Sequence, residues 1–380
     1  MIVELKGLQF VNKGAELMLL AILQEVGGRL PDARFVMVPR KNSPFQQRAK
    51  LGIYQKISCP SSNGLDACRI FGRLLPERAR SDFGLVREEE IDLVLDASGY
   101  TYGDCFKPDN IVNATAQFRR MRKNGAKVVL LPQAIGPFEK ERHRNCFRRL
   151  VDNVDLIFPR DDLSLSYVVE VSGKKDSIIQ APDFTNLLKP KIEKKTAEYR
   201  DKICLIPNNK MLSKTSREEK AKYIPFIVKC IEYLQENGED VFFLIHEGVS
   251  DMRLAENICA GLNQKPPIVK VADALLIKSI IGSSKGVISS RFHGLVSALS
   301  QGIPALATSW SHKYRMLFKD YGFEEGVMSV NPDDHYIEKC LGVFCNQEQY
   351  REIRVRIRER LPGMEAKTTV MWDRVFDLVM

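Results

Sequence analysis

The chain has 380 residues, of which 44% are hydrophobic and 28% are charged, and its formal net charge is +9. This composition excludes a disordered or fibrous protein, and the length is enough for two domains of ordinary size. No stretch approaches the ~20 consecutive apolar residues of a membrane helix, and the first residues do not read as a signal peptide. We therefore expect a cytoplasmic protein whose basic charge suits peripheral contact with an anionic membrane at its inner face.

Short apolar runs alternate with segments of helical period, which is typical of parallel α/β folds. The expected strands cover residues 2–5, 35–38, 91–95, 127–131, 156–158, 203–206, 241–245, 268–271, 287–289 and 305–308. The expected helices cover residues 16–26, 111–123, 218–237, 274–281 and 295–299, with further helices between 347 and 380.

The polar stretch from residue 187 to 202 interrupts this alternation and resembles a linker. It predicts two Rossmann-like domains in a GT-B-like arrangement with a cleft between them. We expect an N-terminal domain over residues 1–190 and a C-terminal domain over residues 191–345. The helices of residues 346–380 are expected to pack back on the first domain.

The most informative stretch is a predicted strand that ends at Ser289 and runs through Ser290, Arg291 and His293 into a helix. Ligands of open α/β sheets bind outside the carboxyl ends of strands. A helix N-terminus and a guanidinium suit an anion there, and a histidine can donate a proton near neutral pH. The alternative is structural, with Arg291 in a salt bridge and His293 capping the helix.

The segment SSRFHGLVSALSQGIP of residues 289–304 resembles the signature of the polysaccharide pyruvyl transferase family. Further similar segments follow in the family's order. They are NKGAE at 12–16, LPQAIGP at 131–137, Arg160-Asp161, Ala181-Pro182-Asp183 and SHKYR at 311–315.

This resemblance implies a pyruvyltransferase with a GT-B-like fold, in which residues 1–190 form the acceptor side and residues 191–345 form the donor side. It also implies phosphoenolpyruvate as donor and, as acceptor, a sugar of a cell-surface polysaccharide, which we expect to be lipid-linked. Carried over residue by residue, it implies that Arg291, His293 and Arg160 hold the donor. The expected product is a pyruvate ketal. We expect His293 to act as the general acid or to bind the departing phosphate, with the arginines neutralising the anionic groups.

The remaining candidates lie at other predicted strand ends. His246, for which helix capping is an equal alternative, and Ser290 are assigned to the donor side. The acceptor side is assigned Asn12, Gly14, Glu16, Tyr100, Asp104, Gln133 and His312. Asn12 as a helix cap and Tyr100 as a packing residue are the plain alternatives. Relatives often carry a glycine triplet where this chain has Ala97-Ser98-Gly99.

Cofactors and metals are not expected, because the nine cysteines are scattered and no cluster has metal-ligand spacing. One alternative function is a nucleotide-sugar glycosyltransferase on the same fold, although the helix after His293 lacks a glutamate for the ribose. The other is a non-catalytic basic protein that binds membranes or nucleic acid. No nucleic-acid-binding motif is present, and nucleic acid is not an expected partner.

Overall fold

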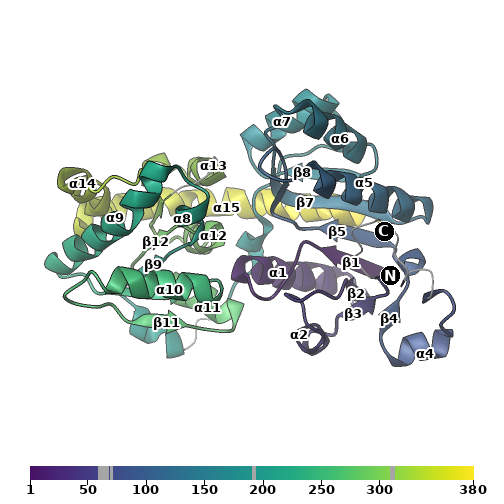
Figure 1. The fold of residues 1–380 in the computed structure, drawn as a ribbon, viewed down its shortest axis with the longest axis horizontal. Coiled ribbons are helices and arrows are strands. Elements are labelled where there is room, and N and C mark those ends of the chain that lie inside the picture. The colour runs from purple at the N-terminus through teal and green to yellow at the C-terminus, as the bar shows by residue number, and fades with distance from the viewer. Residues whose placement is uncertain (59–67, 69–71, 191–193, 309–312) are drawn as a thin grey trace. The chain divides into compact units, whose positions relative to one another are not determined.

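The computed structural model describes residues 1–58, 68, 72–190, 194–308 and 313–380. The chain divides into two compact units. The first contains residues 1–11, 18–184 and 367–380, and the second contains residues 12–17 and 185–366. Each unit is an α/β layer structure with a parallel sheet, as the alternating pattern predicts (Figure 1).

The sheet of the first unit has the strand order β4-β3-β2-β1-β5-β7-β6, and β8 also pairs with β7. All of these pairs are parallel. The strands are β1 (Ile2–Lys6), β2 (Arg34–Met37), β3 (Tyr54–Lys56), β4 (Leu85–Val86), β5 (Leu93–Asp96), β6 (Tyr100–Tyr102), β7 (Lys127–Ile135) and β8 (Leu156–Pro159).

Helices cover this sheet, with α5, α6 and α7 grouped on one side of it in Figure 1. The helical elements of this part of the chain are α1 (Lys13–Arg29), α2 (Phe45–Lys50), α4 (Glu77–Asp82), η1 (Glu88–Glu90), α5 (Pro108–Lys123), α6 (Glu141–Val151), α7 (Asp162–Ser172) and η2 (Phe184–Leu187). The first turn of α1 belongs to the second unit, so this helix spans both units. Asp161 begins α7 by accepting the Ser164 N–H at 2.7 Å.

A buried ion cluster lies inside this unit. Lys56 Nζ contacts Glu4 at 2.8 Å and Glu88 at 3.1 Å, and all three side chains are at most 3% exposed. Burial alone would raise the pKa of Glu88, but Lys56 and Arg120 hold it below its usual value. Such polar pairs explain why the short strand β3 shows no hydrophobic run in the sequence.

The sheet of the second unit has the order β11-β10-β9-β12-β13-β14, again with parallel pairs. Its strands are β9 (Ile203–Ile206), β10 (Val241–Ile245), β11 (Ile268–Lys270), β12 (Gly286–Ser289), β13 (Ala305–Thr308) and β14 (Val327–Met328). The four central strands β10, β9, β12 and β13 are buried along their whole length. Buried parallel strands of this kind read as continuous apolar runs, which is why the sequence reveals them.

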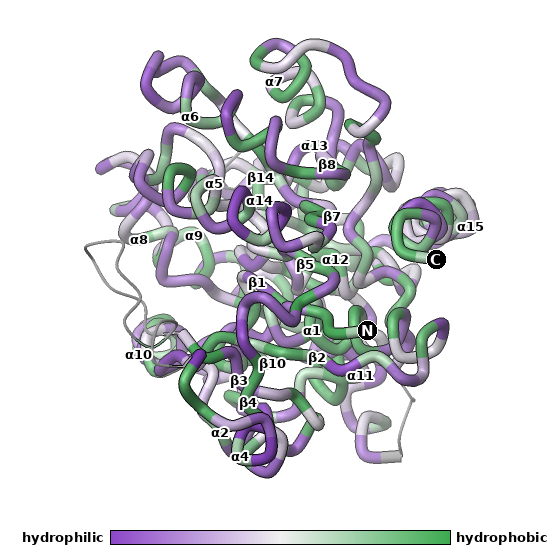
Figure 2. The backbone as a smooth tube through the Cα atoms, turned by 90° about the vertical axis from the view of Figure 1, so that its right-hand side faces the viewer, coloured by the Kyte–Doolittle hydropathy of each residue, from purple (hydrophilic) through white to green (hydrophobic). Residues whose placement is uncertain are grey.

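The helical elements of the second unit enclose this sheet. They are η3 (Lys194–Tyr199), α8 (Lys210–Ser213), α9 (Arg217–Glu236), α10 (Gly248–Cys259), α11 (Ala274–Ser283), α12 (Phe292–Leu299), α13 (Lys313–Asp320), η4 (Glu324–Gly326) and α14 (Asp334–Cys345). Ser216 and Glu219 form a capping box at the start of α9. In Figure 2 hydrophobic residues concentrate on interior strands and hydrophilic residues on the outer loops.

The last helix, α15 (Gln347–Asp377), continues from the second unit into the first. In the second unit it buries Ile353, Ile357 and Met364, and in the first unit it buries Trp372 and Phe376. The Trp372 ring packs edge-to-face on Phe184, with ring centroids 5.9 Å apart. No helix among the described residues is long and apolar enough to cross a membrane.

Candidate functional site

The candidate site of the second unit is built where several strands end. Arg291 follows β12 and occupies the N-cap position of α12, and His293 is the second residue of that helix. His246 and Glu247 follow β10 and lead into α10, which carries Asp251. Strand ends of a parallel sheet meet at one edge, so residues far apart in sequence converge here.

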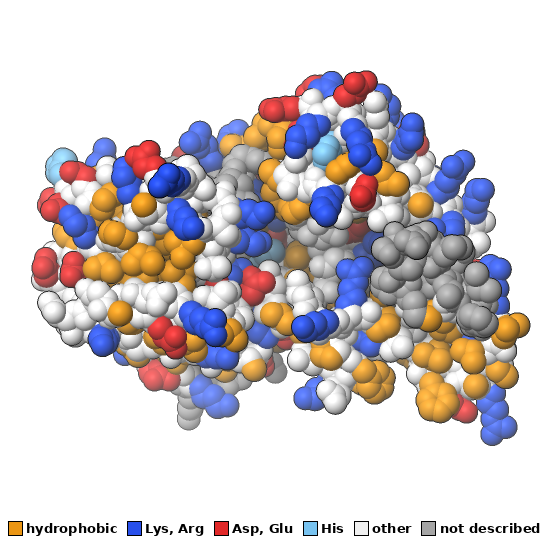
Figure 3. All heavy atoms as spheres, in the orientation of Figure 1, with side chains coloured by type: hydrophobic (Ala, Val, Ile, Leu, Met, Phe, Trp, Pro, Cys, Tyr) orange, Lys and Arg blue, Asp and Glu red, His pale blue; other side chains and the backbone are white. Residues whose placement is uncertain are grey.

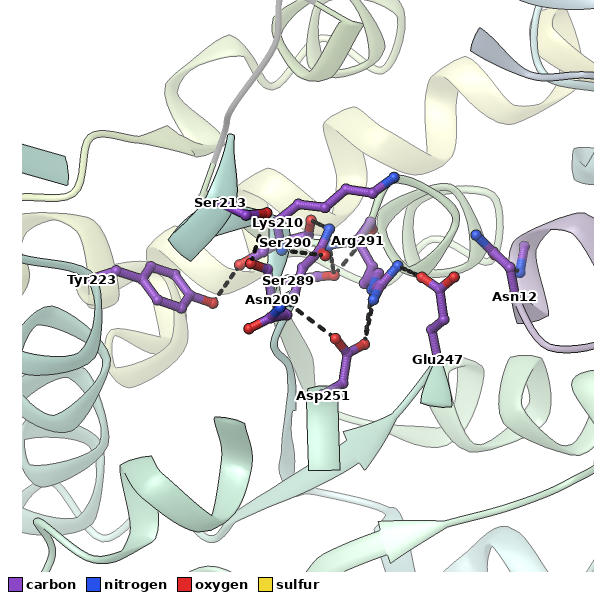
Figure 4. Close-up of polar contacts among 12 residues, drawn as sticks. Asn12, Asn209, Lys210, Ser213, Tyr223, Glu247, Asp251, Ser289, Ser290 and Arg291 are labelled. Carbon is purple, nitrogen blue, oxygen red and sulfur yellow. Dashed lines mark hydrogen bonds and ion pairs between the residues drawn. The ribbon is translucent and has the colours of Figure 1, made fainter. Parts of the chain in front are cut away.

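Arg291 lies between two carboxylates (Figure 4). Its Nε and Nη2 donate to Asp251 Oδ2 at 3.0 and 2.5 Å, and its Nη1 contacts Glu247 Oε2. The Asp251 side chain is completely buried, whereas that of Glu247 is 26% exposed. The structural alternative raised from the sequence, an Arg291 salt bridge, is therefore part of the arrangement.

The Asp251 carboxylate is also held from a third direction, because the Asn209 N–H donates to its Oδ1 at 3.1 Å. Burial raises the pKa of Asp251, and the charge of Arg291 opposes that rise. Lys210 extends alongside Arg291 in Figure 4. Desolvation lowers the pKa of Lys210, and the negative charge of Glu247 opposes this effect.

The first turn of α1 forms another wall of the site. Asn12 pairs with Glu247 in an antiparallel bridge, and the Lys13 N–H donates to the His246 carbonyl at 3.4 Å. Asn12 Oδ1 caps the helix by accepting the Gly14 N–H at 2.9 Å. Gly14 lies so close to the His293 ring that any Cβ at position 14 would overlap it. Glycine is therefore required here by space.

Glu16 lies in the same turn, and its Oε2 accepts a hydrogen bond from Lys13 Nζ at 2.5 Å. Lys13 Nζ also donates to the Ala272 carbonyl at 2.6 Å. Burial raises the pKa of the Glu16 carboxyl, and Lys13 opposes that shift. The contact with Ala272 connects the first turn of α1 to the loop that precedes α11.

The His246 side chain is only 2% exposed, and neither ring nitrogen has a hydrogen-bond partner among the described residues. Burial lowers its pKa well below the usual value, and Arg291, His293 and Lys13 lower it further. Burial therefore favours a neutral imidazole at His246, beside the charges of Arg291 and Lys13. Such an unsatisfied buried group is costly unless something else contacts it.

Ser290, assigned to donor binding from the sequence, is the centre of a buried hydroxyl cluster. Its Oγ hydrogen-bonds Tyr223 Oη at 2.7 Å and also contacts Thr308 Oγ1. Its carbonyl accepts from Asn208 Nδ2 at 2.9 Å and from Tyr314 Oη at 2.8 Å. Burial raises the pKa of Tyr223 to about 12. These contacts give Ser290 a structural role, and its assignment to the donor side stays a prediction.

The other described candidates belong to the first unit. Arg160 follows β8, donates its N–H to the Gln133 carbonyl at 3.0 Å and contacts Asp183 at 3.2 Å. Gln133 is buried, and its Nε2 donates to the Asp96 and Leu131 carbonyls, each at 3.3 Å. These residues lie around the carboxyl half of β7, as expected for strand ends.

Tyr100 and Asp104 brace loops of the first unit. Tyr100 Oη donates to the Gly136 carbonyl at 3.2 Å, and its ring packs edge-to-face on Phe106. Burial raises the Tyr100 pKa. Asp104 Oδ2 accepts the Glu139 N–H at 2.7 Å. His312 lies outside the described residues.

Sequence analysis missed several participants. Sequence patterns did not assign the following residues to the site: Lys13, Asn209, Lys210, Tyr223, Glu247, Asp251 and Thr308. The strand-end rule could have indicated Asn209 and Lys210, because both follow β9. Among the described residues no group of three or more His, Cys, Asp or Glu side chains is placed to hold a metal ion. Among the described cysteines, seven are free thiols and Cys68 is disulfide-bonded.

Comparison with known proteins identifies the family. The family model for polysaccharide pyruvyl transferase matches residues 12–312. The chain belongs to the polysaccharide pyruvyl transferase family. A curated relative is the amylovoran biosynthesis protein AmsJ of Erwinia amylovora. It is 21% identical over 311 residues, which cover 74% of this chain and 73% of AmsJ.

Solved structures with the same fold include UDP-GlcNAc 2-epimerases and a sugar-nucleotide complex. The Neisseria meningitidis epimerase bound to UDP-GlcNAc has a TM-score of 0.61 at 14% identity, covering 99% of this chain and 100% of its own. The putative Listeria monocytogenes epimerase has a TM-score of 0.59 at 13% identity, covering 93% and 90%. Anabaena HepE in complex with UDP-glucose has a TM-score of 0.57 at 10% identity, covering 100% and 98%. At these identities the likeness concerns the fold alone, and the predicted GT-B-like class of this pyruvyl transferase family member is confirmed.

Proposed function

We propose that this protein transfers the enolpyruvyl group of phosphoenolpyruvate to two hydroxyls of a sugar in a polysaccharide repeat unit. The product is a pyruvate ketal, and inorganic phosphate is released. Membership in the polysaccharide pyruvyl transferase family supports a pyruvyl group as the group that is transferred. The likeness to an amylovoran biosynthesis protein supports a polysaccharide acceptor.

The observation that carries the proposal is the close packing of Gly14 against the ring of His293. It brings the first turn of α1 to the first turn of α12, whose backbone N–H groups have no side-chain cap. Helix N-termini favour anions through these donors and through the helix dipole. Phosphoenolpyruvate carries a carboxylate and a phosphate, so it suits the N-terminus of α12, where Arg291 supplies a further positive charge.

Arg291 is positioned for the donor by the buried Asp251, which occupies Nε and Nη2. Its Nη1 contacts the partly exposed Glu247. In the proposed complex, an anionic group of the donor replaces the Glu247 carboxylate at Nη1. The guanidinium then neutralises the donor while Asp251 keeps it in place.

The proposed reaction adds a proton to the methylene carbon of the donor and joins one sugar oxygen to the adjacent carbon. The second sugar oxygen then displaces phosphate from that carbon, and its proton leaves with the phosphate. The two acceptor hydroxyls release two protons in all. One balances the proton added to the methylene carbon, and the other leaves with the phosphate. His293 is the proposed proton donor or phosphate partner, and His246, neutral and buried beside Arg291, completes the donor pocket.

Arg160 remains a proposed donor ligand on the family resemblance alone. Asn12, Gly14, Glu16, Tyr100, Asp104, Gln133 and His312 remain the proposed acceptor side. A lipid-linked acceptor and peripheral contact with an anionic membrane belong to the same proposal and are supported by the net charge of +9. Lysines and arginines are scattered among acidic side chains on the face that Figure 3 shows.

The decisive test is an assay with phosphoenolpyruvate and synthetic or lipid-linked hexose acceptors that follows phosphate release and product mass. We expect release that depends on the acceptor and a product heavier by one pyruvyl ketal. His293→Gln is expected to abolish both, whereas His335→Gln, at a 90% exposed side chain, keeps activity. Thermal stabilisation by nucleotide sugars and not by phosphoenolpyruvate would replace this proposal with the glycosyltransferase alternative.

A further inference from the structure

A cavity opens at the edge of the second unit's sheet where its strands begin. Its volume is about 540 Å³, and its lining includes Arg200, Asp201, Ser284, Lys285 and Arg354. These residues precede β9 and β12 or lie on α15. The candidate donor site lies instead at the carboxyl ends of β10 and β12. At about 3.3 Å per residue, a four-residue strand such as β12 separates the two edges by roughly 10 Å or more.

Two arginines on this cavity lack carboxylate partners. Arg200 and Arg354 form no ion pair with any residue in the described part of the chain, and Arg354 Nε is buried without an acceptor. Lys285, by contrast, is paired with Glu239. Asp201 offsets one charge, so the cavity retains a positive balance. Guanidinium groups without a carboxylate partner in the lining of a cavity suit an anionic ligand.

The cationic groups are held in place by an aromatic side chain. Tyr350 Oη donates to the Lys285 carbonyl at 3.0 Å. Lys285 Nζ lies 6.0 Å from the centroid of the Tyr350 ring, and Arg354 Cζ lies 5.9 Å from it. Such cation–π contacts restrict the long side chains, which reduces the entropy that a ligand must remove on binding.

Hydroxyl groups complete the lining. Thr196 is buried, and its Oγ1 accepts a hydrogen bond from Ser283 Oγ at 2.8 Å at the end of α11. Ser284 donates to the Ile280 carbonyl and keeps its acceptor lone pairs. Ile303 and Ala197 add apolar surface. The lining therefore combines cations, hydroxyl acceptors and apolar contacts in a volume typical of small-ligand sites.

We propose that this cavity is a second binding site, separate from the donor site, for a saccharide that carries a phosphate or a carboxylate. Guanidinium groups bind planar carboxylates and phosphates through paired N–H donors. Hydroxyl oxygens of the lining accept hydrogen bonds from sugar hydroxyls. The proposal does not depend on the donor or on the reaction at the other edge of the sheet.

The test measures binding by calorimetry with the full chain and four probes: glucose 6-phosphate, glucuronate, glucose and inorganic phosphate. We expect at least one of the two anionic sugars to bind, and glucose and inorganic phosphate to bind at least tenfold more weakly. The two anionic sugars distinguish a phosphate from a carboxylate as the recognised group. Absence of binding by both anionic sugars overturns the proposal, as does equal binding by inorganic phosphate.

Variants then locate the site. Arg200→Gln and the pair Arg200→Gln with Arg354→Gln are expected to weaken binding, by tenfold or more in the pair. Arg351→Gln is the matched control, because Arg351 is an exposed residue of α15 outside the cavity lining. Arg200 is exposed, so its single variant keeps the test valid if the pair fails to fold. Binding that survives both Arg200 variants but is lost in His293→Gln belongs to the donor site and overturns the proposal.

Discussion

Asp251 holds Arg291 by two donors of the same guanidinium, at 3.0 and 2.5 Å, although 40 residues separate them in the chain. Asp251 is completely buried, and Arg291 is 7% exposed. A buried ion pair of this kind adds little net stability, because the cost of desolvation offsets much of the attraction between the charges. Its main effect is to fix the orientation of the guanidinium. Arg291 is therefore a positioned group, and its remaining donor Nη1 faces Glu247.

Asp251→Asn is expected to impair both stability and turnover. Removing one member of a buried pair leaves an uncompensated charge and costs about 3–5 kcal/mol. The matched control is Asp334→Asn on α14, where the partner of Lys229 is 85% exposed, and this change should cost no more than about 1 kcal/mol. Urea unfolding together with the kcat for phosphoenolpyruvate measures both effects. Wild-type behaviour of Asp251→Asn would show that Arg291 needs no positioning.

Glu247→Gln is expected to tighten donor binding, because it removes the carboxylate that competes for Arg291 Nη1. A three- to tenfold lower Kd for phosphoenolpyruvate corresponds to about 0.7–1.4 kcal/mol. Calorimetric titration of the variant beside wild type measures it. Weaker binding in Glu247→Gln would mean that Glu247 supports the donor and does not compete with it.

Gly14→Ala is expected to reduce turnover strongly, because the new Cβ overlaps the His293 ring. Overpacking of this kind costs about 1–3 kcal/mol in stability when neighbours must shift. Gly27→Ala in the same helix is the control, because a Cβ there meets no atom within 4 Å. It should be neutral or stabilising, by up to about 1 kcal/mol, because alanine favours helices over glycine. Equal kcat values for Gly14→Ala and Gly27→Ala would show that the contact between Gly14 and His293 does not affect turnover.

Ser290→Ala tests whether the Ser290 hydroxyl stabilises the fold or binds the donor. Tyr223 and Thr308 lose a shared hydroxyl partner, so stability should fall by about 1–3 kcal/mol. The Kd for phosphoenolpyruvate should stay within about twofold of wild type (~0.4 kcal/mol), because the Ser290 hydroxyl is engaged by Tyr223 and Thr308. A large loss of donor affinity with unchanged stability would restore the donor role inferred from the sequence.

The buried His246 predicts a pH dependence of stability. Its pKa is lowered in the folded protein, whereas in the unfolded chain it is near 6.5. Below about pH 6.5 the unfolded state binds more protons, so the free energy of unfolding decreases as the pH falls. The slope from this one group approaches about 1.4 kcal/mol per pH unit.

His246→Gln should flatten that slope between pH 7 and 5.5, whereas His335→Gln, at a 90% exposed side chain, should leave it unchanged. The difference between variant and wild type isolates His246 from carboxyl groups that titrate in the same range. Parallel slopes in wild type and His246→Gln would mean that the imidazole is protonated or solvated in the folded state.

Strands with continuous apolar runs were predictable from the sequence, whereas strands of two or three residues were not. The strands β9, β10, β12 and β13 were expected at or within one residue of their observed bounds, because fully buried parallel strands are continuous in hydrophobicity. The helix containing His293 begins at Phe292 and not at the expected Leu295. The strands β3, β4, β6 and β14 were missed, because two- or three-residue strands carry too little pattern to detect.

The sequence by itself determined the α/β class, the family resemblance and the placement of Arg291 and His293 between a strand and a helix. These features depend on residues adjacent in the chain, where periodicity and strand-end rules apply. Only the tertiary structure decided that the first turn of α1 belongs to the second unit, and that Gly14 contacts His293. It also decided which carboxylates hold Arg291. The physical reason is that local pattern specifies which side chains are buried, whereas their partners depend on how strands far apart in sequence are ordered in the sheet.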